Sequence, residues 1–254
     1  MNIPTIDLSI LWPAFLAGLL VTATHVPLGV QVLKRGIVFI DLAIAQIAGL
    51  GVILADWVGL EPQGWAVQAC ALLAALAGAL LLTWTEKRWP DVQEAVIGVS
   101  FVLAASAALV LLASNPHGGE HLKDLLVGQI LWVTWTRLAL VALLYSVLLA
   151  ILLLQGDRAN RIVFYVVFAC AVTASVQLVG LYLVFTTLIV PALATRRMVR
   201  HRLAMGYALG IVGYAVGLVV STVTDLPSGP AIVCVMTALA IVFGFAAKGR
   251  WTAC

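Results

Sequence analysis

The sequence predicts an all-α, polytopic integral membrane protein with eight or nine transmembrane helices. Of its residues, 63% are hydrophobic and only 10% are charged, whereas a soluble domain carries about 25% charged residues. The apolar residues also form long runs that are separated by short polar breaks. Tryptophans fall near the predicted helix ends, as an interfacial belt requires: Trp12, Trp57, Trp65, Trp84, Trp89, Trp132, Trp135 and Trp251.

The apolar runs define the expected helices in chain order. We expect spans at 9–33, 36–58, 64–85, 94–114, 138–154, 161–178, 180–195, 203–222 and 229–247. The first run follows MNIPTID, which has no Lys or Arg. It therefore lacks the positive region of a cleavable signal peptide and is expected to remain as a span. Because every break is short, we expect one transmembrane domain over residues 1–254.

Lys and Arg gather in alternate breaks. The basic breaks contain Lys34, Arg35, Lys87, Arg88, Arg158, Arg161, Arg196, Arg197, Arg200, Arg202, Lys248 and Arg250. The alternation holds only if residues 161–196 cross twice, with a turn near Gly180. Cytoplasmic loops carry the excess of Lys and Arg, so we expect nine passes, an N-terminus outside and a C-terminus in the cytoplasm. Eight full spans with one helix pair broken near Gly180 is the alternative.

A second irregular stretch lies at residues 125–133. Its sequence, LLVGQILWV, is apolar but too short to span a bilayer. We expect a re-entrant half-helix or an amphipathic loop on the outer surface. Interrupted apolar segments of the first kind often mark a transport pathway.

Few ionisable groups lie inside the predicted spans, and such groups are functional candidates because they are costly in a bilayer. The candidates are His25, Asp41 and Glu94, together with Gln46, which follows Asp41 by a turn and a half. Each of the three ionisable groups has a structural alternative. His25 would be a hydrogen-bonded core histidine, Asp41 would pair with Arg35, and Glu94 would be a helix N-terminal charge.

The predicted outer loop NPHGGEHLKD holds two imidazoles and a carboxylate within five residues: His117, Glu120 and His121. Imidazole and carboxylate together suit zinc, manganese or iron. A solvated polar loop is the alternative. The four cysteines lack metal-binding spacing and are expected in the core. The basic residues lie at membrane borders, so the net charge of +3 indicates no nucleic-acid partner.

Four segments resemble a known family, the membrane permease subunits of ABC importers for zinc, manganese and chelated iron. They are VTASVQLVGLYLVFTTLIVPALAT (172–195), EAVIGVSF (94–101), DLLVGQILWV (124–133) and RGIVFIDLAIAQIAGLGV (35–52).

The resemblance implies a transport subunit in a bacterial cytoplasmic membrane. A second permease copy, making a homodimer, would complete the pathway. Separate ATPase subunits would power it, and an extracytoplasmic metal-binding protein would deliver the ion. The chain has no GxxxxGK[ST] phosphate loop, so we expect no ATP hydrolysis by that machinery in this chain. No permanently bound cofactor is expected. The cargo would be Zn, Mn or Fe, with zinc favoured by the outer histidines.

The chain departs from this family in two places. Leu42 and Gln46 stand where many members carry an Asp and a His, and Asp41 lies one residue early. The break at 155–160 is shorter than the family's cytoplasmic loop for the ATPase. An ion-gradient-driven secondary transporter using Asp41 and Glu94 therefore stays open, as does a non-transporting membrane protein. HExxH, GxSxG and GxGD patterns are absent, which disfavours a membrane hydrolase.

Overall fold

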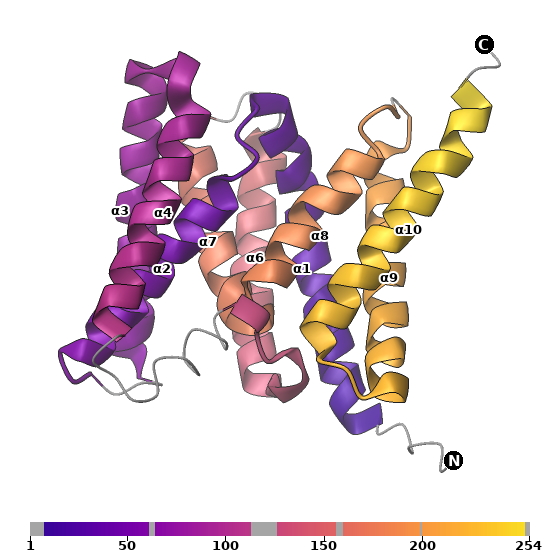
Figure 1. The fold of residues 1–254 in the computed structure, drawn as a ribbon, viewed down its shortest axis with the longest axis horizontal. Coiled ribbons are helices and arrows are strands. Elements are labelled where there is room, and N and C mark those ends of the chain that lie inside the picture. The colour runs from indigo at the N-terminus through magenta and orange to yellow at the C-terminus, as the bar shows by residue number, and fades with distance from the viewer. Residues whose placement is uncertain (1–7, 61–63, 113–125, 156–159, 199, 252–254) are drawn as a thin grey trace. The chain divides into compact units, whose positions relative to one another are not determined.

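The computed structural model describes residues 8–60, 64–112, 126–155, 160–198 and 200–251, with side chains left out for Leu8, Gln155 and 245–251. The elements in order are α1 (Leu8–Arg35), α2 (Ile40–Trp57), α3 (Trp65–Arg88), η1 (Pro90–Val92), α4 (Gln93–Leu112), η2 (Ile130–Trp132), α6 (Trp135–Gln155), α7 (Arg161–Val179), α8 (Leu181–Ala194), α9 (Arg202–Thr224) and α10 (Ser228–Trp251) (Figure 1). The described residues contain no strand. The predicted all-α fold is confirmed, and each predicted span matches one helix to within 4 residues at either end.

Within the described residues, seven helices are long and apolar enough to cross a membrane, namely α1, α2, α3, α4, α6, α7 and α9. The helix α8 is apolar but has only 14 residues. It rises about 21 Å, less than the roughly 30 Å of a hydrocarbon core. A second shorter apolar stretch, Ser228–Gly244, lies in α10.

The described helices form two compact units that interleave along the chain. Unit 1 comprises Met1–Lys34, Val127–Tyr145 and Leu178–Cys254, and unit 2 comprises Arg35–Leu126 and Ser146–Gln177. Because each unit draws on separate stretches of sequence, neither is a contiguous sequence domain.

In unit 2, α2 packs against both α3 and α4 (Figure 1). Small residues allow the close approach. A Cβ added at Gly51 would lie 2.8 Å from the Cys70 carbonyl oxygen, and one at Gly78 would lie 2.8 Å from Ile47 Cδ1. The outer faces of α3 and α4 expose large apolar side chains, as expected for helices facing lipid: Leu73, Leu80, Val99, Val102, Leu103, Leu109 and Val110.

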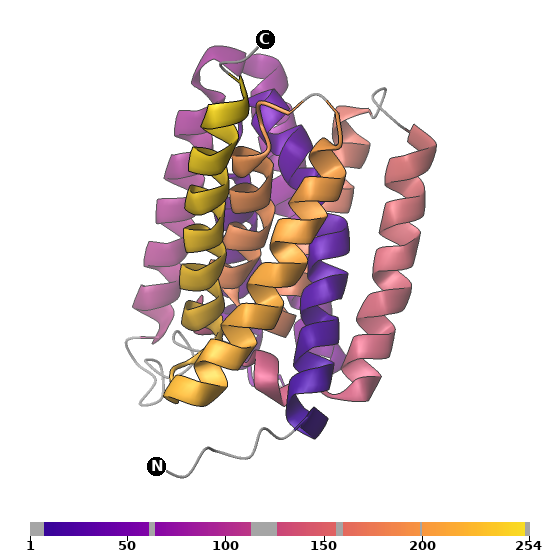
Figure 2. The ribbon, with the colours of Figure 1, turned by 90° about the vertical axis from the view of Figure 1, so that its right-hand side faces the viewer.

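In unit 1, α8, α9 and α10 lie side by side (Figure 2). A glycine at every third or fourth position of α9 brings its neighbours close. Gly206 and Gly210 face α1 at Val26 and Thr22, whereas Gly213 and Gly217 face α10. Small residues at such spacing let helices approach in a membrane, where packing rather than the hydrophobic effect drives association.

The predicted break at Gly180 is confirmed. Between α7 and α8, Gly180 has φ 86° and ψ 161°, a region that is essentially restricted to glycine. It lies against Gly128, whose φ is 71°. In the described part of the second irregular stretch, Gly128 precedes the short turn η2, Ile130 is buried and Trp132 is exposed. The two irregular stretches therefore pack on one another.

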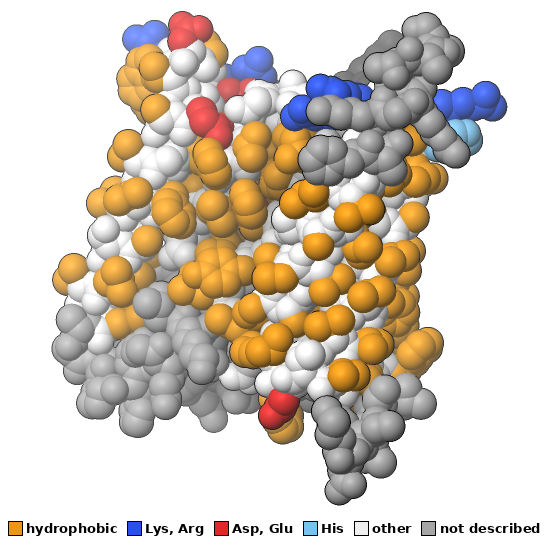
Figure 3. Space-filling view, turned by 45° about the vertical axis from the view of Figure 1, so that its right-hand side comes forward, with side chains coloured by type: hydrophobic (Ala, Val, Ile, Leu, Met, Phe, Trp, Pro, Cys, Tyr) orange, Lys and Arg blue, Asp and Glu red, His pale blue; other side chains and the backbone are white. Residues whose placement is uncertain are grey.

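Charge separates the ends of the helices in each unit. In unit 1, the arginines between α8 and α9 lie at the end opposite Asp225, which closes α9. In unit 2, Lys87 and Arg88 end α3, whereas Asp56 lies at the far end of α2. On the face drawn in Figure 3, hydrophobic side chains cover the helices between their ends.

Candidate functional site

Asp41 lies in the first turn of α2 and is fully buried. Neither of its carboxylate oxygens has a hydrogen-bond partner among the described residues. The expected alternative, a pair with Arg35, is wrong. The Arg35 guanidinium instead lies over the Phe164 ring, 4.2 Å from its centroid. The positive end of the α2 dipole favours the carboxylate, but no side chain in the described part of the chain is hydrogen-bonded to it.

Glu94 lies in the first turn of α4, as expected of a helix N-terminal charge. Its hydrogen bond, however, goes to another helix. Oε1 accepts the backbone N–H of Phe39, the residue before α2, at 3.3 Å. Oε2 is buried and lacks a partner in the described structure. The structure therefore brings Asp41 and Glu94 to the same end of α2.

His25 is fully buried in the middle of α1. Its Nδ1 lies 3.0 Å from the Val21 carbonyl oxygen and 2.9 Å from Thr24 Oγ1. A carbonyl only accepts, and the Thr24 hydroxyl also donates to the Val21 oxygen at 3.1 Å. The arrangement therefore favours the proton on Nδ1, which leaves a lone pair on Nε2. Nε2 has no hydrogen-bond partner among the described residues.

Nδ1 of His25 is hydrogen-bonded, as the core-histidine interpretation predicts, but Nε2 has no partner among the described residues. A histidine that donates one ring N–H to a carbonyl and keeps the other nitrogen open has the arrangement typical of a metal ligand.

The remaining candidates are Gln46 and the three residues of the predicted outer loop. Gln46 is half-buried on α2 and lies about 140° around the helix axis from Asp41. The amide and the carboxylate therefore lie on different faces. His117, Glu120 and His121 fall outside the described residues. In the described ranges, no three His, Cys, Asp or Glu side chains lie close enough to hold a metal ion.

A polar seam between α1, α8 and α9 was not predicted. The Thr187 hydroxyl and the Tyr214 hydroxyl are 3.0 Å apart and buried. Tyr207 donates to the Ala23 carbonyl at 3.3 Å, and Thr22 Oγ1 is buried without a partner in the described structure. The sequence did contain a feature that indicates this seam, because hydroxyl-bearing residues occur within otherwise apolar helices.

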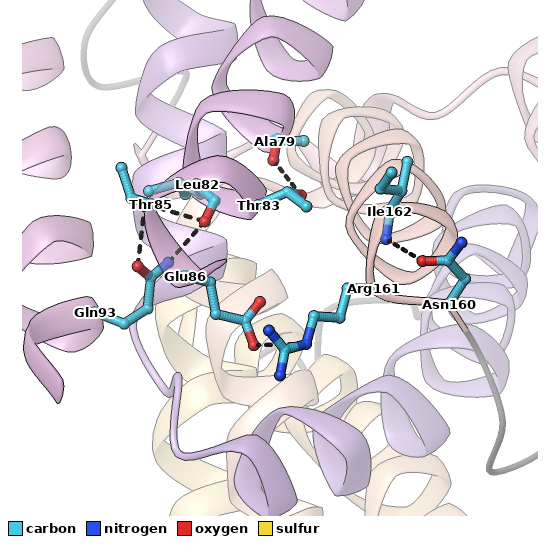
Figure 4. A network of polar contacts seen from close by, with 9 residues as sticks. All are labelled: Ala79, Leu82, Thr83, Thr85, Glu86, Gln93, Asn160, Arg161 and Ile162. Atoms are coloured by element: carbon cyan, nitrogen blue, oxygen red, sulfur yellow. Dashed lines mark hydrogen bonds and ion pairs between the residues drawn. The ribbon is translucent and has the colours of Figure 1, made fainter. Parts of the chain in front are cut away.

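A second unpredicted network lies at the basic end of unit 2 (Figure 4). Gln93 Nε2 donates to the Leu82 carbonyl at 3.0 Å, and Gln93 Oε1 accepts the Thr85 hydroxyl at 3.0 Å. Nearby, Glu86 Oε1 and Arg161 Nε form an ion pair at 3.7 Å. The first contacts tie the start of α4 to the last turns of α3, and the ion pair ties α3 to the first residue of α7.

Comparison with known proteins shows that the chain is similar to membrane transport proteins. The family model described as "ABC 3 transport family" matches residues 7–158 and 156–247. The chain is 25% identical over 249 residues to the high-affinity zinc uptake system membrane protein ZnuB of Haemophilus influenzae, covering 88% of this chain and 92% of the relative.

The chain is 26% identical over 264 residues to the manganese transport system membrane protein MntC of Halalkalibacterium halodurans, covering 94% of this chain and 88% of the relative. The fold is similar to that of PsaBC from Streptococcus pneumoniae in complex with Fab. The TM-score is 0.73 at 17% identity, over 93% of this chain and 91% of that chain.

Proposed function

Because this chain belongs to the ABC 3 transport family, we propose that it is the permease subunit of an importer for a divalent transition-metal ion. The observation that carries this proposal is the near full-length similarity to relatives named for zinc and manganese transport. We treat residues 1–254 as one permease domain. Zinc is favoured over manganese and iron because of His117 and His121 in the outer loop.

Three groups are our candidates for contact with the cargo. They are His25 Nε2, the Asp41 carboxylate and Glu94 Oε2, each of which is buried and has no hydrogen-bond partner among the described residues. Within the described residues these groups do not form a three-ligand site. Single contacts of this kind suit transport, because conduction needs binding strong enough to admit an ion and weak enough to release it.

Partners and orientation follow from the same proposal. Two ATPase subunits, an extracytoplasmic metal-binding protein, a second permease copy and the lipid of a bacterial inner membrane complete the importer. The basic ends of the helices would face the cytoplasm, in line with the distribution of Lys and Arg. That orientation places the N-terminus outside and the C-terminus inside, with Asp225 on the outer side.

Co-purification tests the proposal directly. We expect the tagged permease to retain ATPase and metal-binding protein subunits, and the complex to hydrolyse ATP faster when zinc, manganese or iron is added. A permease that purifies without an ATPase, or a complex indifferent to all three metals, would contradict it.

The contribution of His25 is tested by His25→Asn. The Asn amide can still donate toward the Val21 carbonyl but removes the Nε2 lone pair. We expect slower metal uptake at an unchanged amount of permease. Replacing His117 and His121 together by Ala should also weaken uptake, and unchanged uptake would favour the solvated-loop alternative.

One observation favours a second function. Asp41 and Glu94 both carry buried carboxylate oxygens without a partner in the described structure, as an ion-gradient-driven transporter would require. Depleting ATP while maintaining the ion gradient separates the two functions. The importer stops under these conditions, whereas a secondary transporter continues.

A further inference from the structure

Pro27 lies inside α1 and leaves a backbone carbonyl without its usual donor. A proline has no N–H, so residue 27 cannot donate to the carbonyl of Ala23, four residues earlier. Lipid offers no replacement, and a carbonyl freed in this way inside a membrane is satisfied by a neighbouring helix or a polar side chain. The Tyr207 hydroxyl of α9 supplies the donor, 3.3 Å from the Ala23 carbonyl oxygen. Tyr207 therefore ties α9 to the turn of α1 that Pro27 opens.

The same turn of α1 packs closely on α9 (Figure 2). A Cβ added at Gly206 would lie 2.9 Å from Val26 Cγ1. One added at Gly210 would lie 2.6 Å from Thr22 Cγ2. Tyr207 lies between these two glycines in the sequence. The glycines let the two backbones approach, and the hydroxyl of Tyr207 adds the directional contact that fixes how the turn is placed.

His25 belongs to this turn, because it lies between Ala23 and Pro27. Its Nδ1 is 3.0 Å from the Val21 carbonyl oxygen, which holds the ring against the backbone of its own helix. Its Nε2 is buried and has no hydrogen-bond partner among the described residues. The direction of Nε2 is therefore set by the place of the turn, and the place of the turn is set in part by Tyr207.

We propose that Tyr207 is a positioning residue, which acts through the Ala23 carbonyl to hold His25 Nε2 where the metal ion meets it during import. This inference rests on the proposed importer function and on His25 as a contact for the metal. Tyr207 does not touch the ion. Its role is that of a group that orients a metal-binding histidine, one residue further removed than a direct partner of the imidazole.

Metal uptake by the complete importer tests this role, in cells whose own permease gene is replaced by each variant. Tyr207→Phe removes the hydroxyl and keeps the ring. We expect the zinc, manganese or iron concentration for half-maximal uptake to rise by about tenfold, the lower end of the loss when the support of a metal-binding histidine is removed. The amount of permease in the membrane should stay unchanged. The matched control is Tyr182→Phe, because Tyr182 is 47% exposed on α8, and this variant should transport as the wild type does.

Pro27→Ala tests the hydrogen bond itself. An alanine at this position has an N–H that can donate to the Ala23 carbonyl, which makes the Tyr207 hydroxyl dispensable there. Tyr207→Phe alone should lower the Tm of the purified permease by about 5 °C. In the Pro27→Ala background it should leave Tm unchanged. An equal fall in both backgrounds would show that Tyr207 does not compensate for Pro27, and would overturn the inference.

A double-mutant cycle separates positioning from a general structural role. His25→Asn removes the Nε2 lone pair, so adding Tyr207→Phe should change uptake by no more than about twofold. A second tenfold loss would overturn the inference, as would wild-type uptake in Tyr207→Phe or a loss explained entirely by less permease. Wild-type uptake in His25→Asn would also overturn it, but would leave the importer function standing. Absence of metal uptake by the wild-type importer would instead refute the proposed function.

Discussion

Replacing Gly180 by Ala tests whether the break between α7 and α8 is built as described. The φ of 86° and ψ of 161° lie where an L-residue is strained, at a cost of about 1–3 kcal/mol. The new Cβ would also meet the backbone nitrogen of Gly128 and lie 2.5 Å from the Val127 carbonyl carbon. Because backbone atoms cannot rotate away, we add about 1–3 kcal/mol for overpacking.

The sum is a loss of about 2–6 kcal/mol in the free energy of unfolding. A restricted unfolded chain offsets about 0.4–1 kcal/mol of that loss. For a chain of this size, each kcal/mol lowers Tm by about 2–4 °C, so we expect Tm to fall by about 10 °C. The assay is thermal unfolding of the purified permease in detergent, followed by tryptophan fluorescence.

The matched control is Gly98→Ala in α4, where an added Cβ meets nothing within 4 Å. Alanine is favoured over glycine inside a helix by about 0.5–1 kcal/mol, so the Tm of this variant should stay the same or rise slightly. If Gly180→Ala melts at the wild-type temperature, the close contact between Gly180 and Gly128 is refuted.

Three further substitutions test other parts of the structure. Asp41→Asn removes a buried charge that has no hydrogen-bond partner among the described residues, so Tm should stay the same or rise, while metal uptake should fall by about tenfold if the carboxylate contributes about 1.4 kcal/mol to cation passage. A lower Tm with normal uptake would make Asp41 structural. Thr187→Val leaves the Tyr214 hydroxyl buried without its partner and should cost about 1–3 kcal/mol; with Tyr214→Phe added, the two losses should not be additive. Gly29→Ala places a Cβ against the Leu188 carbonyl and should lower stability by about 1–3 kcal/mol, and an unchanged Tm would refute the contact of α1 with α8.

The positions of the helices could be predicted because the apolar runs and the breaks between them are local features of the sequence. Each apolar run ends at a charged or glycine-containing break, and the polar centre of residues 161–196 indicated a turn near Gly180. The packing of Gly180 on Gly128 was not predictable, since no periodicity in the sequence relates the two irregular stretches.

The candidate sites were only partly predictable, because burial and pairing depend on which helices meet. Asp41 and His25 were identified as costly groups, but the Arg35 pairing expected for Asp41 is wrong because Arg35 lies on Phe164. The bond from Phe39 to Glu94 joins residues 55 positions apart. The contact of Glu86 with Arg161 was not predicted, since it arises from tertiary packing.

Cellular metal content tests the central claim most directly. The permease gene is deleted, and zinc, manganese and iron are measured in cells grown with each metal limiting. We predict that accumulation of at least one of the three falls and recovers when the gene is restored. Unchanged accumulation of all three metals would contradict a metal importer permease.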